Sequence, residues 1–253
     1  RHQVDVYWSS ITGVAPIVKR ELPTPVDWSM FGVAKDNTAF GGRMGFTNNI
    51  AYVVAYDPRK VSEADMPKTW DQLLDPKYKD KMASSLFLMP RLISALSIEW
   101  GQDKSLDFAR KLAKDTGILL TRAPRDSILQ SGERVIAPAE VDILPKLWAA
   151  GGMPVKHVIP APVVLGQFGA TVLAKAPHPS AARLLAGWLA SKQGKKARHK
   201  AVFEADLRPG SDDPVAQKIY ASGVPVIQDS VENMEPRAAL YRKAADILTG
   251  QGK

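Results

Sequence analysis

The sequence predicts an α/β fold with mixed, mostly parallel sheets flanked by helices. Two observations predict it. Short runs rich in β-branched and aromatic residues alternate with stretches of helical periodicity along the 253 residues. The composition, 45% hydrophobic and 24% charged, is typical of a globular chain that buries a sizeable core. No apolar run reaches about 18 residues, so the sequence shows no membrane span.

The elements follow in order from these patterns. The predicted strands cover residues 4–8, 48–56, 136–139, 163–166 and 170–174, and residues 9–13 form a hydroxyl-rich loop after the first strand. The predicted helices cover residues 69–74, 105–114, 126–131 and 180–202, with two or three more between residues 214 and 249. Thr69 and Gln72 have the spacing of a capping box.

Composition and motifs exclude several functions. The chain has no cysteine, which rules out disulfides, zinc thiolate sites and thiol nucleophiles. Its four histidines are far apart, and no nucleotide-binding or nucleophile motif occurs, so we expect no enzyme activity and no metal or cofactor. The formal charge of +8 suggests an anionic ligand or a basic, solvated surface. The basic tract "KQGKKARHK" lacks interleaved aromatic residues, which favours a solvated helix end over nucleic-acid binding.

Several segments together carry a resemblance. In order they are "VDVYWSS", "AYVVAYDPRKV", "MPKTWDQLLDPKYKDKM", "SGERVIAPAEVDILPKLWAAGGMPV" and "GATVLAKAPHPSAARLLAGWLASKQGKKA". They resemble the extracellular solute-binding proteins of ABC importers, in particular the ferric-iron and small-anion group. The match runs from Val4 to Pro209.

The resemblance implies a type II periplasmic binding protein with two lobes and a hinge of two extended strands. The first lobe would hold residues 1–54 and 165–225, and the second would hold residues 55–164 and 226–253, with hinges near residues 51–57 and 163–169. Members of this family begin with further strands and helices, so we expect the native protein to be longer at its N-terminus, by roughly two βαβ units.

The same resemblance points to the residues that would bind a solute. In the first lobe they follow the first predicted strand, with one more between the two hinge glycines: Trp8, Ser9, Ser10, Thr12 and Gln167. In the second lobe they lie in a predicted loop at 88–94 and in a turn at 121–127: Arg91, Arg122, Arg125 and Ser127. A guanidinium beside a helix N-terminus suits an anion. Trp8 could equally be a core residue, and each arginine could equally form a surface salt bridge.

The ferric-binding members place two adjacent tyrosines in the segment that here covers residues 137–147. Asp142 and Ile143 fall about where that pair would be, with Glu140 close by, and the segment contains no tyrosine. Glu140 and Asp142 could contact a ligand, or could act as helix caps. The departure argues against iron.

The resulting expectation is the substrate-binding component of an ABC import system. It would capture a small polar, anionic solute between its lobes and deliver it to a permease of the inner membrane. We expect a monomer in the periplasm, or one anchored outside the cell by a lipid. The alternatives are a ferric-ion binding protein with other ligands, and a sensor or enzyme on the same scaffold.

Overall fold

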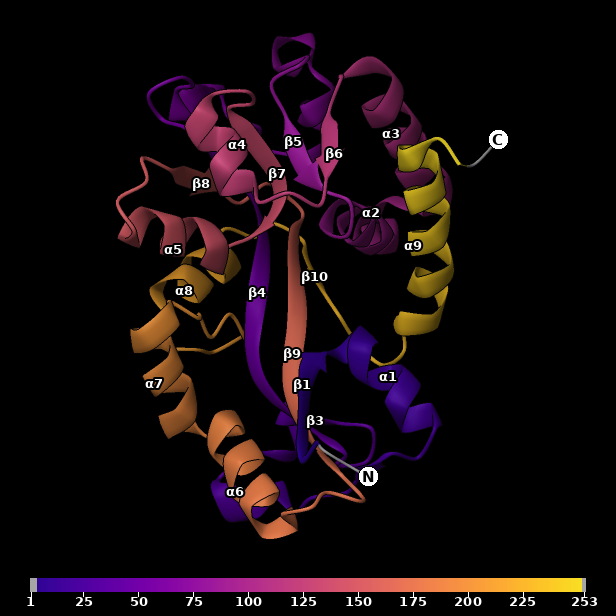
Figure 1. The fold of residues 1–253 in the computed structure, drawn as a ribbon, viewed down its shortest axis with the longest axis vertical. Helices are drawn as coiled ribbons and strands as arrows, with labels where there is room; N and C mark the ends of the chain where they lie inside the picture. Colours follow the sequence, from indigo (N-terminus) through magenta and orange to yellow (C-terminus); the bar gives the residue numbers. More distant parts are fainter. Residues whose placement is uncertain (1–3, 252–253) are drawn as a thin grey trace. The chain divides into compact units, whose positions relative to one another are not determined.

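The computed structural model describes residues 4–251, in which strands and helices alternate (Figure 1). The strands are β1 (Val6–Ser10), β2 (Pro23–Thr24), β3 (Thr38–Ala39), β4 (Met44–Tyr56), β5 (Ala83–Ser85), β6 (Leu119–Thr121), β7 (Ile136–Val141), β8 (Lys156–Val158), β9 (Val163–Leu173) and β10 (Val226–Gln228). The α-helices are α1 (Ile11–Lys19), α2 (Leu88–Trp100), α3 (Gln102–Asp115), α4 (Arg125–Ser131), α5 (Ile143–Ala150), α6 (Pro179–Ala190), α7 (Lys192–Val202), α8 (Pro214–Ala221) and α9 (Met234–Thr249).

The chain folds into two compact units, each built from separate stretches of sequence. The first unit takes in the chain up to Ile50, then Gly166–Ala221 and Asp229–Met234. The second unit takes in Ala51–Leu165, Ser222–Gln228 and the chain from Glu235 onward. Strands β4 and β9 each contribute residues to both units, so the backbone passes between the units in extended conformation.

The pairing of the strands differs from the mostly parallel arrangement that the sequence predicts. Strands β1 and β2 pair antiparallel with β9, and β3, β7 and β8 pair antiparallel with β4. Between the strands of residues 4–251, the parallel pairs are β10 with β9 and β5 with β6. The prediction assumed crossover helices between neighbouring strands, whereas here short strands fold back along two long ones.

Each unit has its own hydrophobic core. In the first unit, Ile11 and Val14 of α1 pack with Met44 and Phe46 of β4. In the second unit, Trp70 and one face each of α2 and α3 pack against β4. Burying a side chain of this size stabilises a fold by about 1.5–3 kcal/mol, so these clusters fix the position of β4 in each unit.

Residues 9–13 are not the loop that the sequence predicts. Ser9 and Ser10 complete β1, and α1 begins at Ile11 without an intervening loop. The Ser10 hydroxyl caps the helix, since its Oγ accepts a hydrogen bond from the Gly13 amide at 3.3 Å. Serine is a favoured N-cap, and the apolar residues that follow supply the buried helix face.

The predicted loop at residues 88–94 is also wrong, because this stretch is the first half of α2. The Oγ of Ser85 accepts hydrogen bonds from the amides of Phe87 and Leu88, which satisfies donors at the start of the helix. Pro90 lies in the first turn of the helix, where a missing backbone N–H costs nothing. Arg91 is therefore a helical residue.

Strand β9 is continuous where the sequence predicts two strands with a loop at residues 166–169. The glycines that suggest a loop serve close packing instead. A Cβ atom at Gly169 would lie 2.6 Å from the carbonyl oxygen of Gly45, and one at Gly166 would lie 3.1 Å from a side-chain carbon of Ile50. Glycine inside a strand often marks such a close approach of another backbone. Gln167 therefore lies within a strand.

The helix predicted over residues 180–202 is divided into α6 and α7. Ser191 between them has an extended backbone, and its Oγ accepts a hydrogen bond from the Gly194 amide at 3.2 Å as the cap of α7. A Cβ atom at Gly194 would lie only 1.9 Å from the Trp188 carbonyl oxygen, so the corner requires glycine. The basic tract is thus a separate helix.

Two smaller predictions are also corrected. The stretch Trp70–Leu74 is a 3-10 helix, and the Thr69 side chain does not cap it. The Gln72 side chain instead accepts a hydrogen bond from the Lys68 amide at 2.7 Å. Near the C-terminus, strand β10 lies between α8 and α9, where the sequence predicts helices alone.

Candidate functional site

The polar end of β1 forms the first part of the candidate site, in the first unit. Ser10 is buried, and its Oγ lies 3.0 Å from the Thr12 Oγ1. Both hydroxyls lie at the N-terminus of α1, where free amide groups and the helix dipole favour negative charge. The hydroxyl of Ser9 lies beside Gly13, where a Cβ atom would meet it at 2.3 Å. The sequence analysis predicts Ser9, Ser10 and Thr12 as neighbours in one site, and the structure brings these three residues together.

Trp8 lies on the surface of this unit. Its side chain is 44% exposed, which decides between the core and surface alternatives left by the sequence. The indole N–H donates to the Thr47 Oγ1 at 2.9 Å, and the ring lies 5.3 Å from that of Phe168, centroid to centroid, tilted by 39°. These contacts hold one edge of the indole, so that much of the ring remains open for stacking.

Gln167 precedes Phe168 in β9 and is buried. Phe168 pairs with Ser10 in the antiparallel register of β1 and β9, which places the glutamine close to the strand end. Gln167 therefore lies next to the sheet partner of Ser10, although it is in a strand and not in the predicted loop.

The first half of β4 supplies polar residues to the candidate site that the sequence analysis does not single out. The Thr47 hydroxyl lies 2.9 Å from the Asn48 Oδ1 and 3.3 Å from the Phe168 carbonyl oxygen, to one of which it can donate. Asn48 and Asn49 are only 5% and 1% exposed, and among the described residues the Nδ2 of each has no hydrogen-bond partner. A buried amide without a partner costs about 1–3 kcal/mol. The sequence signal that could have identified these residues is the polar dipeptide "NN" inside an otherwise apolar strand.

The basic tract of α7 contacts this strand. Arg198 donates from Nη2 to the Thr47 carbonyl oxygen at 2.9 Å, and its Nε lies 2.5 Å from Glu204. Burial lowers the pKa of Arg198, and Glu204 partly offsets this. Burial also lowers the pKa of Lys195 to about 8, with a further contribution from the charge of Arg208. The tract is therefore not a solvated helix end over its whole length, because one face of it is partly buried.

In the second unit, Arg125 is engaged in an ion pair. It begins α4, and its guanidinium contacts the carboxylate of Glu140 through Nε at 2.5 Å and through Nη2 at 3.3 Å. Glu140 is fully buried. Burial raises the pKa of Glu140, while the hydrogen bond and charge of Arg125 lower it. The pair connects α4 to β7, which leaves this guanidinium with little capacity for a solute.

Asp142 connects β4 to the start of α5. Its Oδ1 accepts a hydrogen bond from the Ala51 amide at 3.0 Å, and its Oδ2 lies 2.5 Å from the Lys146 Nζ. The carboxylate does not cap α5, although the residue occupies the cap position. Both its oxygens are used within the fold.

The remaining predicted residues of the second unit are exposed and take no part in the ion pair of Arg125 with Glu140: Arg91, Arg122 and Ser127. Arg91 is in the first turns of α2, and Arg122 lies over the ring of Phe87 at 5.4 Å from its centroid. Among residues 4–251, neither arginine has an ion-pair partner. Ser127 is on α4, two residues after Arg125. The second unit thus offers two unpaired guanidinium groups.

Most of the chain matches a known protein family. The family model of bacterial extracellular solute-binding proteins matches residues 2–219. Within the described residues, no helix is long and apolar enough to cross a membrane, and no group of three or more histidines and carboxylates gathers as a metal site would require. No curated protein matches the sequence.

Solved structures of this class share the fold. Iron-bound HitA from Pseudomonas aeruginosa has a TM-score of 0.78 at 19% identity, over 98% of this chain and 83% of HitA. The substrate-binding protein of an ABC transporter from Agrobacterium tumefaciens has a TM-score of 0.79 at 14% identity, over 98% and 80%. AfuA from Actinobacillus pleuropneumoniae, with fructose 6-phosphate bound, has a TM-score of 0.74 at 17% identity, over 98% and 83%. These neighbours confirm the two-lobe α/β class of periplasmic binding proteins. With the family match over most of its length, the chain belongs to the bacterial extracellular solute-binding proteins.

Proposed function

We propose that the chain is the substrate-binding component of an ABC importer for a small polar anion. The observation that carries this proposal is the set in the first unit, where an open indole lies beside hydroxyl groups at a helix N-terminus and beside buried amides without partners. Such a set provides a stacking surface and several donors, which is what a polar solute needs. The Agrobacterium tumefaciens protein, named as part of an ABC transporter, supports the transport role.

Hydrogen-bond donors and two arginines support the proposed negative charge of the solute. The Nδ2 groups of Asn48 and Asn49 and the N-terminus of α1 donate hydrogen bonds, and Arg91 and Arg122 are guanidinium groups without carboxylate partners in the described chain. AfuA was solved with fructose 6-phosphate, a sugar that carries an anionic group. A solute of this kind combines an anion for the donors with a ring face for Trp8.

Ferric ion is a weaker candidate, although HitA was solved with iron. The carboxylates nearest to the expected tyrosine positions, Glu140 and Asp142, are bound by Arg125 and Lys146. A ferric ion would have to displace both cations from partly buried ion pairs. Solute capture by lobe closure, delivery to an inner-membrane permease, a monomeric state and a periplasmic or lipid-anchored location complete the proposal, with no catalytic role.

A thermal-unfolding screen tests the proposed solute. The purified chain is heated with fructose 6-phosphate, citrate, glucose as a neutral control, and a ferric salt. A ligand that binds only the native state raises the melting temperature with its concentration. We expect an increase with one of the anions and none with glucose. An increase with the ferric salt alone would favour the iron alternative, and no increase with either anion would contradict the anionic solute.

The role of Trp8 has a matched control in Trp188, which is exposed to a similar extent on α6 of the same unit. Trp8→Ala should weaken binding of the anion found in the screen by roughly tenfold, as expected for loss of a stacked aromatic contact. Trp188→Ala should bind as the unchanged chain does. Titration calorimetry measures both. Equal binding by all three proteins would show that the indole does not contact the solute.

A further inference from the structure

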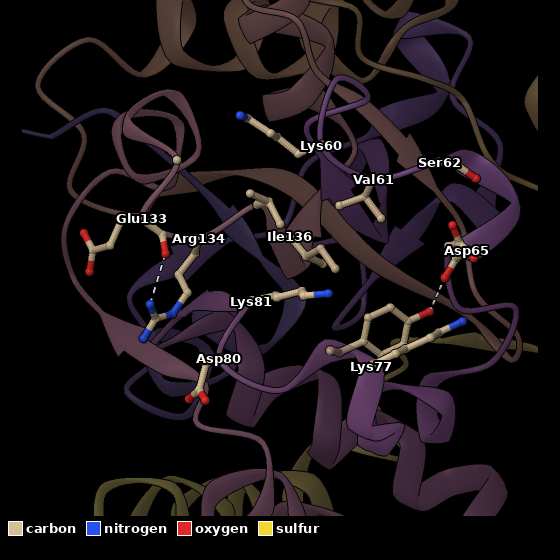
Figure 2. A pocket seen from close by; sticks show the side chains of 13 residues that line it. Lys60, Val61, Ser62, Asp65, Lys77, Asp80, Lys81, Glu133, Arg134 and Ile136 are labelled. Atoms are coloured by element: carbon tan, nitrogen blue, oxygen red, sulfur yellow. Dashed lines mark hydrogen bonds between the residues drawn. The ribbon is translucent and has the colours of Figure 1, made fainter.

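A pocket of about 570 Å³ lies within the second unit and shares no residue with the proposed solute site (Figure 2). Side chains from three segments line it, within residues 60–65, 77–81 and 132–136. The middle segment belongs to the lysine-rich run "DPKYKDKM". The volume of the pocket falls within the range of small-molecule sites.

Hydrogen bonds join the three segments, so the pocket is formed before any ligand arrives. The Asp57 amide donates to the Val135 carbonyl oxygen at 3.0 Å, and the amides of Val135 and Ile136 donate to the Lys81 carbonyl oxygen at 3.0 and 3.1 Å. On the other side, the Tyr78 hydroxyl donates to the Asp65 carbonyl oxygen. A preformed pocket loses little conformational entropy when it binds a ligand.

Apolar side chains form the floor of this pocket. Ile136 is fully buried, and Val61 and Val135 are partly buried beside it. Figure 2 shows Val61 and Ile136 between Lys60 above them and Lys81 below them. The arrangement places two ammonium groups around an apolar surface.

The charged side chains of the pocket differ in whether they have a partner within the protein. Lys77 lies over the Tyr78 ring at 4.9 Å, and its pKa is raised first by its side-chain interaction with Tyr78, with smaller contributions from the charges of Asp75 and Asp65. The Asp80 carboxylate lies against Gly117, where a Cβ atom would meet it at 1.9 Å. Within residues 4–251, Lys60 and Lys81 have no hydrogen-bonding or ion-pair partner for their ammonium groups.

Arg134 is the fourth cation that lines the pocket. Its Nη1 donates to the Glu133 carbonyl oxygen at 3.0 Å, while its Nε is covered and has no partner among the described residues. A covered N–H without an acceptor is costly. Figure 2 shows the Glu133 carboxylate directed away from Lys81.

We infer that this pocket binds a small organic anion, with a carboxylate or phosphate group between Lys60 and Lys81 and an apolar body on Val61 and Ile136. The inference does not depend on the identity of the transported solute. A carboxylate and a phosphate meet the same requirement, because either gives a short hydrocarbon a single anionic group.

The experiment uses probes that differ only in their headgroup: hexanoate, hexyl phosphate, hexanol and hexylammonium. The full chain is labelled with ¹³C in its valine and isoleucine methyl groups, and the signals of Val61 and Ile136 are followed during each titration. We expect saturable shifts with hexanoate or hexyl phosphate, and affinities about tenfold or more lower for hexanol and hexylammonium. Equal affinities for charged and neutral probes, or no saturable shift at these methyl groups, would overturn the inference.

A matched pair of variants locates the charge requirement. Lys60→Gln/Lys81→Gln removes both pocket ammonium groups, and Lys68→Gln/Lys79→Gln removes two exposed lysines of the same region that do not line the pocket. All four side chains are exposed, so both variants should fold. The first variant should lose about tenfold or more in affinity for the bound anion, and the second should retain it. Unchanged affinity in the first variant would also overturn the inference.

Discussion

At the residue scale, the pair of Arg125 and Glu140 makes stability depend on pH. Burial raises the pKa of Glu140, and Arg125 limits that rise. For a group whose pKa is raised in the folded state, stability falls as the pH increases through that pKa. Arg125→Met removes the limiting charge, so it should cost about 3 kcal/mol near neutral pH and less in mild acid, where Glu140 can be protonated.

Urea unfolding at the two pH values measures this difference. Arg122→Met is the control, because Arg122 is exposed and lies over Phe87 without an ion pair in the described chain. Adding Glu140→Gln to Arg125→Met should recover part of the loss near neutral pH, since no buried charge remains. A loss that is the same at both pH values would contradict the assigned cause.

Lys195 gives a prediction of opposite sign. Its pKa is lowered to about 8 from 10.5, first by burial and then by the charge of Arg208. Between these two pH values the unfolded chain binds more protons, so the stability of the native protein rises with pH. Lys195→Met should therefore be more stable than the natural chain at neutral pH, by about 1–3 kcal/mol, and the gain should fall as the pH approaches 10.5.

The exposed neighbour Lys196 provides the control for this lysine. Lys196→Met should change the free energy of unfolding by no more than about 0.5 kcal/mol at either pH, as most surface substitutions do. Denaturant unfolding at neutral and alkaline pH measures both variants. A gain for Lys195→Met that did not depend on pH would mean that added apolar contact, and not charge, is responsible.

At the scale of elements, the corner between α6 and α7 depends on a single glycine. A Cβ atom at Gly194 would lie 1.9 Å from a backbone carbonyl oxygen, so Gly194→Ala must move one helix relative to the other. We expect a loss of about 1–3 kcal/mol in the free energy of unfolding, typical of overpacking. Gly151→Ala is the control, since its nearest neighbour would be at 3.4 Å and its φ is −78°. Equal effects of the two substitutions on urea unfolding would contradict the steric argument.

The elements also show what the sequence could predict. Local patterns located the longer strands β1, β4, β7 and β9 and most of the α-helices, because β-branched runs and 3.6-residue periodicity depend on neighbours in the chain. They failed where a residue serves a distant contact. Gly166 and Gly169 bounded a predicted loop, although the missing side chain of Gly169 allows the close approach of Gly45.

The candidate site divides in the same way. Trp8 and Ser10 could be found from the sequence because they follow a strand and precede a helix, a local arrangement. Asn48 and Asn49 could not be interpreted, since their lack of hydrogen-bond partners among the described residues becomes visible only when the neighbouring strands are placed. Arg125 could be identified as a candidate from the sequence. Its ion pair with Glu140, 15 positions away, depends on the packing of α4 on β7.

At the scale of the whole molecule, the two units share β4 and β9, and each unit is completed by chain that has passed through the other. A unit that loses its order therefore releases one half of both strands. We predict that the two units unfold together in a single transition, although each has its own core.

The tryptophans allow this prediction to be tested. Three of the six lie in the first unit, at positions 8, 28 and 188, and three lie in the second, at positions 70, 100 and 148. With 5-fluorotryptophan, ¹⁹F spectra follow all six during a urea titration. Leu96→Ala empties part of the core of the second unit and should cost about 3 kcal/mol, while Val14→Ala acts on the first unit in the same way with a smaller loss. Each substitution should lower the urea midpoint of all six native signals equally, because the shared strands transmit the loss. If Leu96→Ala shifted only the three signals of the second unit, the strands would act as flexible connections, and each unit would have to be regarded as an independently folding lobe.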